Sequence, residues 1–554
     1  MQGNLLQKGI DIFLKRQTNI LSAAFVIMAT VLLSQFLGII RQRLLVSVFG
    51  ASDTLGVYLA ATRLPDFIFQ LIIAGALSSA FIPVFSDFLT KGKEKEAHKM
   101  ASTLLMLGML LFASVALVLF IMAPFFLKVF NLGLGFSPTQ MELMVHIMRI
   151  IIFGQFIFIV GTFFSALLQS YNHFFIPGFA AGMYNLGIII ALITLPPVLG
   201  IFAPAVGVLF GAFLFVLFQL PMVATVGFHF RPSFSLRIEG VMQVVKLMWP
   251  RTLAIGIFQM GALVTLSLIS FLPSSGRNYV IFDYAQTLAF APIVLFGQAI
   301  AQAVFPVLSR EKDRLEEFKR TFITSFNQIL YLILPVSVLF LVLRIPIVRL
   351  VFGVAEFDWG ATVLTGKTLA YFSVSMFAQS LVYLASRGFY ALHNTKIPLI
   401  VGGIATGAML VLGGVFILIY HWGVESIAIA YSFASIVHFI MLLFLLDKKV
   451  GGFEKRVLLV SAAKIGLASL CTGFALYIPI KLLDQLVFDT TRTINLLILT
   501  GISSCAGISL YVFLTWFFNV PEATTFLVLF RRIGNWKEVL GKTEEIIDTT
   551  TVKP

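Results

Sequence analysis

Fourteen apolar stretches, each long enough to cross the roughly 30 Å hydrocarbon core of a bilayer, constrain what this chain can fold into. A chain inside hydrocarbon must pair its own backbone polar groups, so stretches of this kind form helices. The whole chain is 59% hydrophobic and 12% charged, with a mean hydropathy of +0.99. The sequence therefore predicts an all-α membrane protein of about 14 transmembrane helices, at 20–48, 55–89, 100–130, 141–169, 175–198, 201–227, 247–273, 279–308, 321–343, 360–391, 398–420, 424–446, 457–480 and 494–518.

Lys and Arg are unevenly shared between the two sets of connecting segments. With the first segment on the inner side, inner segments hold 25 Lys and Arg and outer segments hold 5. Cytoplasmic loops carry such an excess of Lys and Arg. We therefore expect a multi-pass membrane protein with both termini cytoplasmic. The net charge of +14 follows from this topology and needs no nucleic-acid partner.

Two internal matches indicate a duplication. The segment 76–88 resembles 299–311, which aligns Pro83 with Pro306, and 170–177 resembles 391–398 at a nearly equal offset. Six helices per repeat give both halves the same orientation, a pattern known in transporters that rock two bundles around a central site. We predict an N-lobe at 1–228, a C-lobe at 229–447, two further helices at 448–518, and a cytoplasmic amphipathic segment and tail at 519–554.

Several basic residues lie deep in the predicted spans, where a cation needs water, a counter-ion or a ligand. They are Arg41, Arg63, Arg149, Arg251 and Lys367. Acids there are fewer, and we expect Asp66 and Asp283 to pair with some of these cations, for instance Asp66 with Arg63. The excess positive charge fits a cavity for an anion, and guanidinium suits phosphate because it donates two hydrogen bonds at once. A lipid diphosphate is one fitting ligand, and simple charge pairing is the alternative.

Enzyme signatures do not occur in the sequence. It has no Walker loop, no G-x-S-x-G, no H-E-x-x-H and no His and Cys at metal-ligand spacing. The two cysteines, Cys471 and Cys505, both lie in apolar runs. We therefore expect a protein that is not an enzyme and that has no cofactor, structural metal or disulfide.

Three segments carry a resemblance to a known family. "SQFLGIIRQRLLVSVFGAS" with the following "AATRLPDFIFQLIIAGALSSAFIPVFSDF", then "YAQTLAFAPIVLFGQAIAQAVFPVLS" and "SRGFYALHNTKIP", resemble helices 1, 2, 8 and the 10–11 segment of the MurJ/MviN lipid II flippases. These belong to the multidrug/oligosaccharidyl-lipid/polysaccharide exporter superfamily. The resemblance implies transport of lipid II to the outer leaflet by alternating access, a basic cavity for the diphosphate, and a lipid groove formed by the last two helices.

The resemblance also assigns roles to individual residues. Arg41 falls on a cavity arginine of the first helix, Arg63 on the basic residue before the second-helix proline, and Arg387 on the arginine of the 10–11 segment. Other family charges are absent, and Gly56, Ala74 and Thr287 stand at three such positions. Arg149, Arg251 and Lys367 are candidates to replace the lost charge. Three functions stay open: a lipid II flippase, a flippase of another polyprenyl-diphosphate glycan, and a scaffold that binds cell-wall synthesis proteins without transport.

Overall fold

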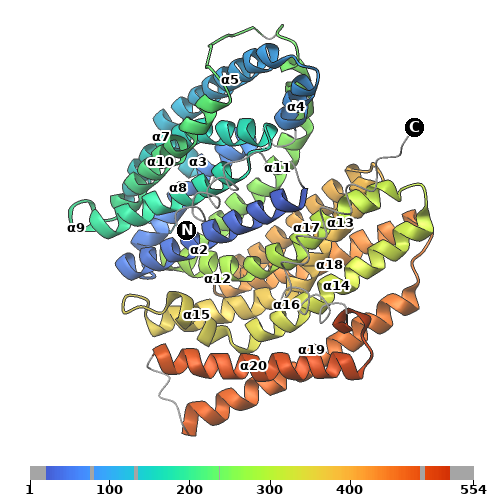
Figure 1. The fold of residues 1–554 in the computed structure, drawn as a ribbon. Helices are drawn as coiled ribbons and strands as arrows, with labels where there is room; N and C mark the ends of the chain where they lie inside the picture. Colours follow the sequence, from blue (N-terminus) through green and yellow to red (C-terminus); the bar gives the residue numbers. More distant parts are fainter. Residues whose placement is uncertain (1–19, 75–79, 130–134, 236, 487–492, 525–554) are drawn as a thin grey trace, which may run out of the picture. The chain divides into compact units, whose positions relative to one another are not determined.

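The computed structural model describes residues 20–74, 80–129, 135–235, 237–486 and 493–524, and all regular structure in these ranges is helical (Figure 1). Thirteen of the described helical segments are long and apolar enough to cross a membrane. The remaining predicted span, 247–273, coincides with helix α11 (Val241–Ile269), which includes the shorter apolar segment Gln259–Ile269. The predicted all-α membrane fold is therefore confirmed.

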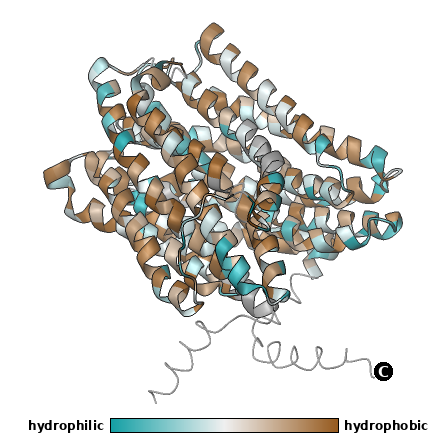
Figure 2. Ribbon diagram, turned by 90° about the horizontal axis from the view of Figure 1, so that it is seen from above, coloured by the Kyte–Doolittle hydropathy of each residue, from teal (hydrophilic) through white to brown (hydrophobic). Residues whose placement is uncertain are grey.

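Apolar residues extend along most of the length of the helices (Figure 2). Large apolar side chains remain exposed on them, for example Phe474 at 70% and Ile494 at 72%. In water such surface would be unfavourable, but in a bilayer it faces acyl chains of the same polarity. The exposed apolar surface thus agrees with a multi-pass membrane protein.

The chain forms two compact units, of which the first comprises residues 1–283, 351–365 and 406–427, and the second comprises the rest. The helices wholly in unit 1 are α2 (Ile20–Phe49), α3 (Asp53–Phe69), η1 (Gln70–Ala74), α4 (Ile82–Thr90), α5 (Glu94–Ile121), α6 (Ala123–Val129), α7 (Pro138–Ser170), α8 (Phe175–Thr194), α9 (Pro196–Leu199), α10 (Phe202–Thr225), α11 and η4 (Val415–Ile419). Those wholly in unit 2 are η3 (Ile293–Gln298), α13 (Ala299–Arg310), α14 (Leu315–Val342), α19 (Lys455–Leu486) and α20 (Thr493–Phe517). The helices α12 (Ser275–Pro292), α15 (Arg344–Phe352), α16 (Trp359–Ala391), α17 (Lys396–Gly414) and α18 (Glu425–Lys449) run from one unit into the other.

The helix bounds repeat along the chain with a nearly constant offset. Helix α7 spans Pro138–Ser170 and α16 spans Trp359–Ala391, so both ends recur 221 residues later. The same offset relates the start of α2 to that of α11, of α5 to α14, of α6 to α15, and of α8 to α17. Two π-helical segments, η1 and η3, begin 223 residues apart. The duplication seen in two short sequence matches therefore extends over six spans in each half.

Small residues let three helices of unit 1 approach closely. A Cβ on Gly187 of α8 would lie 2.4 Å from the Cα of Gly211 on α10. Glycines of this kind bring membrane helices together because van der Waals contact, not hydrophobicity, drives their association. Asn185 of α8 then donates to the backbone carbonyl of Ser34 on α2 at 3.1 Å. These contacts fix α2, and with it Arg41, against α8.

In unit 2 the last two helices are tied to α14 and to each other. The Tyr511 hydroxyl of α20 donates to the carbonyl of Tyr331 on α14 at 2.7 Å. Lys464 of α19 donates to the carbonyl of Phe518, just after α20, at 2.8 Å. A cation at a helix C-terminus satisfies an unpaired carbonyl and interacts favourably with the helix dipole. This contact accounts for a lysine within a transmembrane helix.

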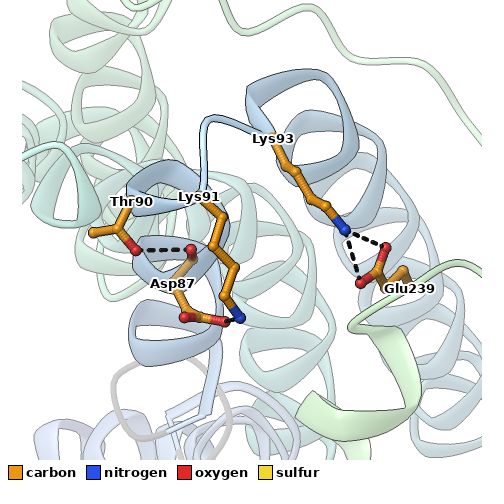
Figure 3. A network of polar contacts seen from close by, with 5 residues as sticks. All are labelled: Asp87, Thr90, Lys91, Lys93 and Glu239. Carbon is orange, nitrogen blue, oxygen red and sulfur yellow. Dashed lines mark hydrogen bonds and ion pairs between the residues drawn. The ribbon is translucent and has the colours of Figure 1, made fainter.

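The segment before α11 rests on the ends of α4 and α5 (Figure 3). Lys93 contacts both carboxylate oxygens of Glu239, at 3.3 and 3.2 Å, while Lys91 contacts Asp87 at 2.6 Å. Exposed pairs of this kind contribute only about 0–1 kcal/mol. Packing at Gly240 is more restrictive, because its φ is +85° and a Cβ there would lie 2.4 Å from the sulfur of Met100. The predicted domain boundaries remain a prediction, and most of the predicted C-terminal segment, 525–554, lies outside the described residues.

Candidate functional site

A cluster of charged and polar side chains lies among the helices of unit 1, and Arg63 is at its centre. Arg63 donates to the hydroxyl of Tyr279 and to the carboxylate of Asp283, both on α12. Asp66, which we expected as a partner of Arg63, instead accepts a hydrogen bond of 2.5 Å from the amide of Gln155 on α7. The ion-pair partner of Arg63 is therefore Asp283, 220 residues away in the chain.

The local structure of α3 explains how one helix presents both charges. Residues three apart on a helix lie on the same face, which places Arg63 and Asp66 side by side. Helix α3 gives way to the π-helical segment η1 at Gln70, one turn after Asp66. Such π-helical turns are rare and often lie at functional sites. Hydropathy does not reveal this change, because the apolar run continues through it.

Arg41 on α2 lies beside this cluster. Its guanidinium interacts electrostatically with the carboxylate of Asp66 and with the hydroxyl groups of Tyr58 and Tyr184. The Nε atom of Arg41 is buried, and no hydrogen-bond acceptor reaches it among the residues that the structure describes. A buried donor without an acceptor costs about 1–3 kcal/mol, more when it is charged. Arg41 thus offers a hydrogen bond that this chain's described residues leave unused.

A cavity of about 250 Å³ opens next to these side chains. Its polar lining comes from four helices and η1: Arg63, Asp66, Gln70, Gln155, Tyr184 and Gln259. Phe69 and Phe158 line the cavity too, and the Phe158 ring lies 4.8 Å from that of Tyr184. The site therefore combines amides, charges and aromatic faces, the mixture by which proteins orient a polar ligand.

The beginnings of α3 and α12 touch each other at one end of unit 1. A Cβ on Gly56 would lie 2.2 Å from the carbonyl oxygen of Gly276, so only glycine fits at this contact. Asp53 accepts a hydrogen bond of 2.8 Å from the backbone N–H of Arg277. By the charge pattern of the sequence these residues belong to outer segments. We call this contact the α3–α12 closure, and sequence reasoning missed it.

Arg277 extends the closure to the start of α16. Its guanidinium donates to Asp358 at 2.9 Å, and Asp358 also accepts from the backbone N–H of Ala361 at 2.9 Å. Partial burial raises the pKa of Asp358, but the hydrogen bond from Ala361 and the charge of Arg277 outweigh it, so the pKa lies below its ordinary value. Asp358 is therefore ionised at neutral pH and joins α12 to α16.

The other predicted binding residues lie elsewhere. Arg149 donates to the carbonyl of Phe120 at 3.1 Å and lies over the ring of the same residue at 5.0 Å, within unit 1. In unit 2, Arg387 lies over the rings of Phe305 and Tyr390, and Lys367 is exposed on α16. Arg251 belongs to α11, but its side chain lies outside the described residues. Of the predicted residues, the structure brings together Arg41, Arg63, Asp66 and Asp283.

Comparisons with known proteins agree on one family. A family model described as lipid II flippase MurJ matches residues 45–495. A probable lipid II flippase MurJ of Bdellovibrio bacteriovorus is 27% identical over 488 residues, covering 87% of this chain and 91% of that protein. A lipid II flippase MurJ of Burkholderia cenocepacia is 27% identical over 407 residues, covering 71% and 77%.

Solved structures show the same fold. A lipid II flippase MurJ in an inward closed conformation has a TM-score of 0.73 and 23% identity, and the match covers 89% of this chain and 99% of that one. An inward-facing multidrug resistance transporter of the MATE family, from the MOP superfamily, has a TM-score of 0.62 and 14% identity, covering 77% and 98%.

Proposed function

Because the chain belongs to the MurJ family of lipid II flippases, we propose that it moves lipid II from the inner to the outer leaflet of the bacterial cytoplasmic membrane. It does so by alternating access and catalyses no covalent step. The family model covers most of the chain, and the curated relatives are matched over most of their length. Transport of another polyprenyl-diphosphate glycan and a purely scaffolding role are less well supported.

The residue-level observation that best supports this proposal is the unused hydrogen-bond donor of Arg41, its Nε–H group. Its buried Nε faces no acceptor among the described residues, although it lies in the same cluster as Arg63. A diphosphate supplies several anionic acceptor oxygens, and guanidinium groups bind such oxygens with charge-assisted hydrogen bonds. Arg41 and Arg63 therefore form the binding site for the diphosphate, while Asp66 and Asp283 hold the two guanidinium groups in place.

Transport follows the membrane potential in this proposal. The termini are cytoplasmic, as the charge pattern predicts. Lipid II moves from the inner to the outer leaflet, so its anionic head moves outward. An inside-negative potential favours this by about 2.3 kcal/mol per charge per 100 mV. Binding of the diphosphate neutralises the cavity arginines and permits the change of state. Cell-wall synthesis proteins are natural partners of a protein that supplies their substrate.

Complementation of a strain depleted of its own lipid II flippase tests the proposal. We expect Arg41→Ala to abolish growth at wild-type protein levels. Arg149→Ala is the matched control, because Arg149 is also an intramembrane arginine but is bound to the Phe120 carbonyl. Growth should survive that change. Normal growth with Arg41→Ala would remove Arg41 from the mechanism, and failure of the wild-type chain to complement would contradict lipid II transport itself.

A further inference from the structure

Residues 351–358 lead from the end of α15 to the start of α16, and a cation from the first transmembrane helix binds where they begin. The Arg43 guanidinium of α2 donates to the Val351 carbonyl at 3.0 Å and also contacts the Gly353 carbonyl, at 3.5 Å. The last carbonyls of a helix have no partner within it, and a cation stabilises them and the helix dipole. Arg43 therefore caps α15, although it lies 308 residues before Val351. We call residues 351–358 the outer strap, because the charge pattern of the sequence places them in an outer segment.

The outer strap makes two further contacts, and every residue in them belongs to unit 1. Gly50 follows α2 with a φ of +65°, and a Cβ there would lie 2.5 Å from the carbonyl oxygen of Glu356. At the end of the strap, both carboxylate oxygens of Asp358 contact the guanidinium of Arg277 on α12, each at 2.9 Å. The outer strap thus joins the outer ends of α2 and α12.

The first half of the chain repeats the backbone contact of the strap. At the offset of 221, Glu356 corresponds to Gly135, which precedes α7 as Glu356 precedes α16. A Cβ on Gly135 would lie 2.4 Å from the carbonyl oxygen of Ser270. Ser270 directly follows α11, as Gly50 directly follows the equivalent helix α2. In each half, the segment before the fourth span therefore packs against the end of the first helix of the other half.

The charges of the outer strap, in contrast, are not repeated. At the same offset, Arg43 corresponds to Val264 and Asp358 corresponds to Ser137. Ser137 caps α7 as Asp358 caps α16, so the cap itself needs no charge. The carboxylate of Asp358 additionally binds Arg277. The second half therefore holds its segment with two arginines that the packing of the first half does without.

We propose that the outer strap holds the outer side of the protein closed, and that Arg43 is the residue that positions it. The inference rests on the proposed function, because alternating access must open the outer side to release the lipid. On opening, Arg43 and Arg277 leave the strap, and water takes their place on the carbonyls and the carboxylate. Polar contacts suit surfaces that separate in this way, because water replaces each lost hydrogen bond.

Labelling with a membrane-impermeant thiol reagent, from the outer side of right-side-out membrane vesicles, tests the proposal in the full-length protein. One reporter is Ala51→Cys, which is 5% exposed and adjoins Gly50. The other is Ser275→Cys, which is 1% exposed and whose Oγ would lie 2.7 Å from a Cβ on Gly135. Cys471 and Cys505 are replaced by serine in both. Local loosening of the strap exposes only the first reporter, whereas opening of the outer side exposes both.

Arg43→Met removes the donors to the strap at similar length. Losing a hydrogen bond from a charged group should raise the labelling rates of both reporters roughly 10- to 150-fold. Arg43→Lys keeps the charge, so its rates should lie between those of Arg43→Met and the wild type. Arg277→Met removes a more exposed ion pair and should raise both rates by up to about 5-fold.

Gly50→Ala tests the strap without changing a charge, because its Cβ would meet the Glu356 backbone. It should raise the labelling rate of Ser275→Cys. Gly92→Ala is its matched control, since Gly92 has a φ of +69° but a Cβ there meets no atom within 4 Å. Arg149→Met is the matched control for Arg43→Met, because Arg149 also donates to a backbone carbonyl, that of Phe120. Both controls should keep wild-type rates.

The Ser275→Cys rate decides between a strap that closes the outer side and a local contact. Wild-type rates there in Arg43→Met and Gly50→Ala overturn the proposal, even if Ala51→Cys reacts faster. An equal increase in Arg149→Met also overturns it, since the cause is then a general loss of stability. Gly50→Ala decides the question if Arg43→Met does not fold. Labelling needs no lipid II, so a wild-type chain that fails to complement contradicts the proposed function while the rates still decide on the strap.

Discussion

Replacement of Gly56 by alanine should open the α3–α12 closure without removing any charge. The new Cβ would lie 2.2 Å from the carbonyl oxygen of Gly276, and ordinary contact begins at 3.4 Å. The atoms in the way are backbone, so no side chain can rotate aside. The two helices must therefore separate by roughly 1 Å, and overpacking of this kind costs about 1–3 kcal/mol. Because the cost applies only to the closed arrangement, it shifts the equilibrium toward the open one by roughly 5- to 150-fold.

Labelling by a membrane-impermeant thiol reagent from the outer side measures this shift. Leu55 is fully buried next to the contact, so Leu55→Cys is a suitable reporter once Cys471 and Cys505 are replaced by serine. We expect Gly56→Ala to raise the labelling rate of this cysteine within the range above. Gly403→Ala is the control, because a Cβ at Gly403 on α17 meets no atom within 4 Å.

The same contact can be tested from its other side. A Cβ on Gly276 would lie 2.5 Å from the carbonyl oxygen of Asp53, so Gly276→Ala should act in the same direction. Folding of each variant is checked by its thermal unfolding midpoint in detergent. Wild-type labelling rates in both folded variants would refute the idea that this glycine contact holds the outer side closed.

Three further predictions concern single charges. Arg149→Met should lower the free energy of unfolding by about 1–2 kcal/mol through loss of its hydrogen bond and ring contact, seen as a lower thermal midpoint; a selective loss of prenyl diphosphate binding would contradict this structural role. Asp283→Asn should bind prenyl diphosphate more weakly than wild type in calorimetry, because Arg63 loses the carboxylate that holds it in place, and tighter binding would argue that Asp283 mainly competes with the ligand for Arg63. The lowered pKa of Asp358 means that its contacts stabilise the folded protein fully above its unfolded pKa of about 3.9 and are lost as pH falls through the still lower folded value. Amide exchange at residues 359–363, corrected for intrinsic rates, should therefore be faster in Asp358→Asn than in wild type at pH 6, and the difference should shrink as the pH is lowered below the unfolded pKa of about 3.9; a difference that does not change with pH in the folded protein would contradict the assignment.

The helices could be predicted from the sequence because hydrocarbon imposes a simple length and polarity rule. The predicted span 141–169 matches α7, Pro138–Ser170, to within three residues. The predicted span 55–89 was less accurate, since α3 ends at Phe69 and the π-helical segment η1 follows. A π-helical turn changes backbone hydrogen bonds but not composition, so hydropathy carries no trace of it.

The partners of the charges could not be predicted in the same way. Arg41 and Arg63 stood out because cations are costly in a bilayer. Which acid each one meets depends on contacts between helices far apart in the chain, and Asp283 is 220 residues from Arg63. Gln155 carries no charge and lies in an apolar run, so nothing in its sequence context marked it. Arg149 gave the same signal as Arg41, although it binds a backbone carbonyl.

Because the chain is duplicated, the charged residues of the site can be compared with the equivalent positions in the second half. At the offset of 223 that relates η1 to η3, Arg63 and Asp66 correspond to Gln286 and Ala289, and at the offset of 221 that relates α2 to α11, Arg41 corresponds to Ala262. The two halves therefore repeat their helices but not these charges. Symmetric packing needs only equivalent apolar faces. Because a cation is costly wherever it lies in the bilayer, the absence of these charges from the second half and the unused donor of Arg41 support the proposed diphosphate site.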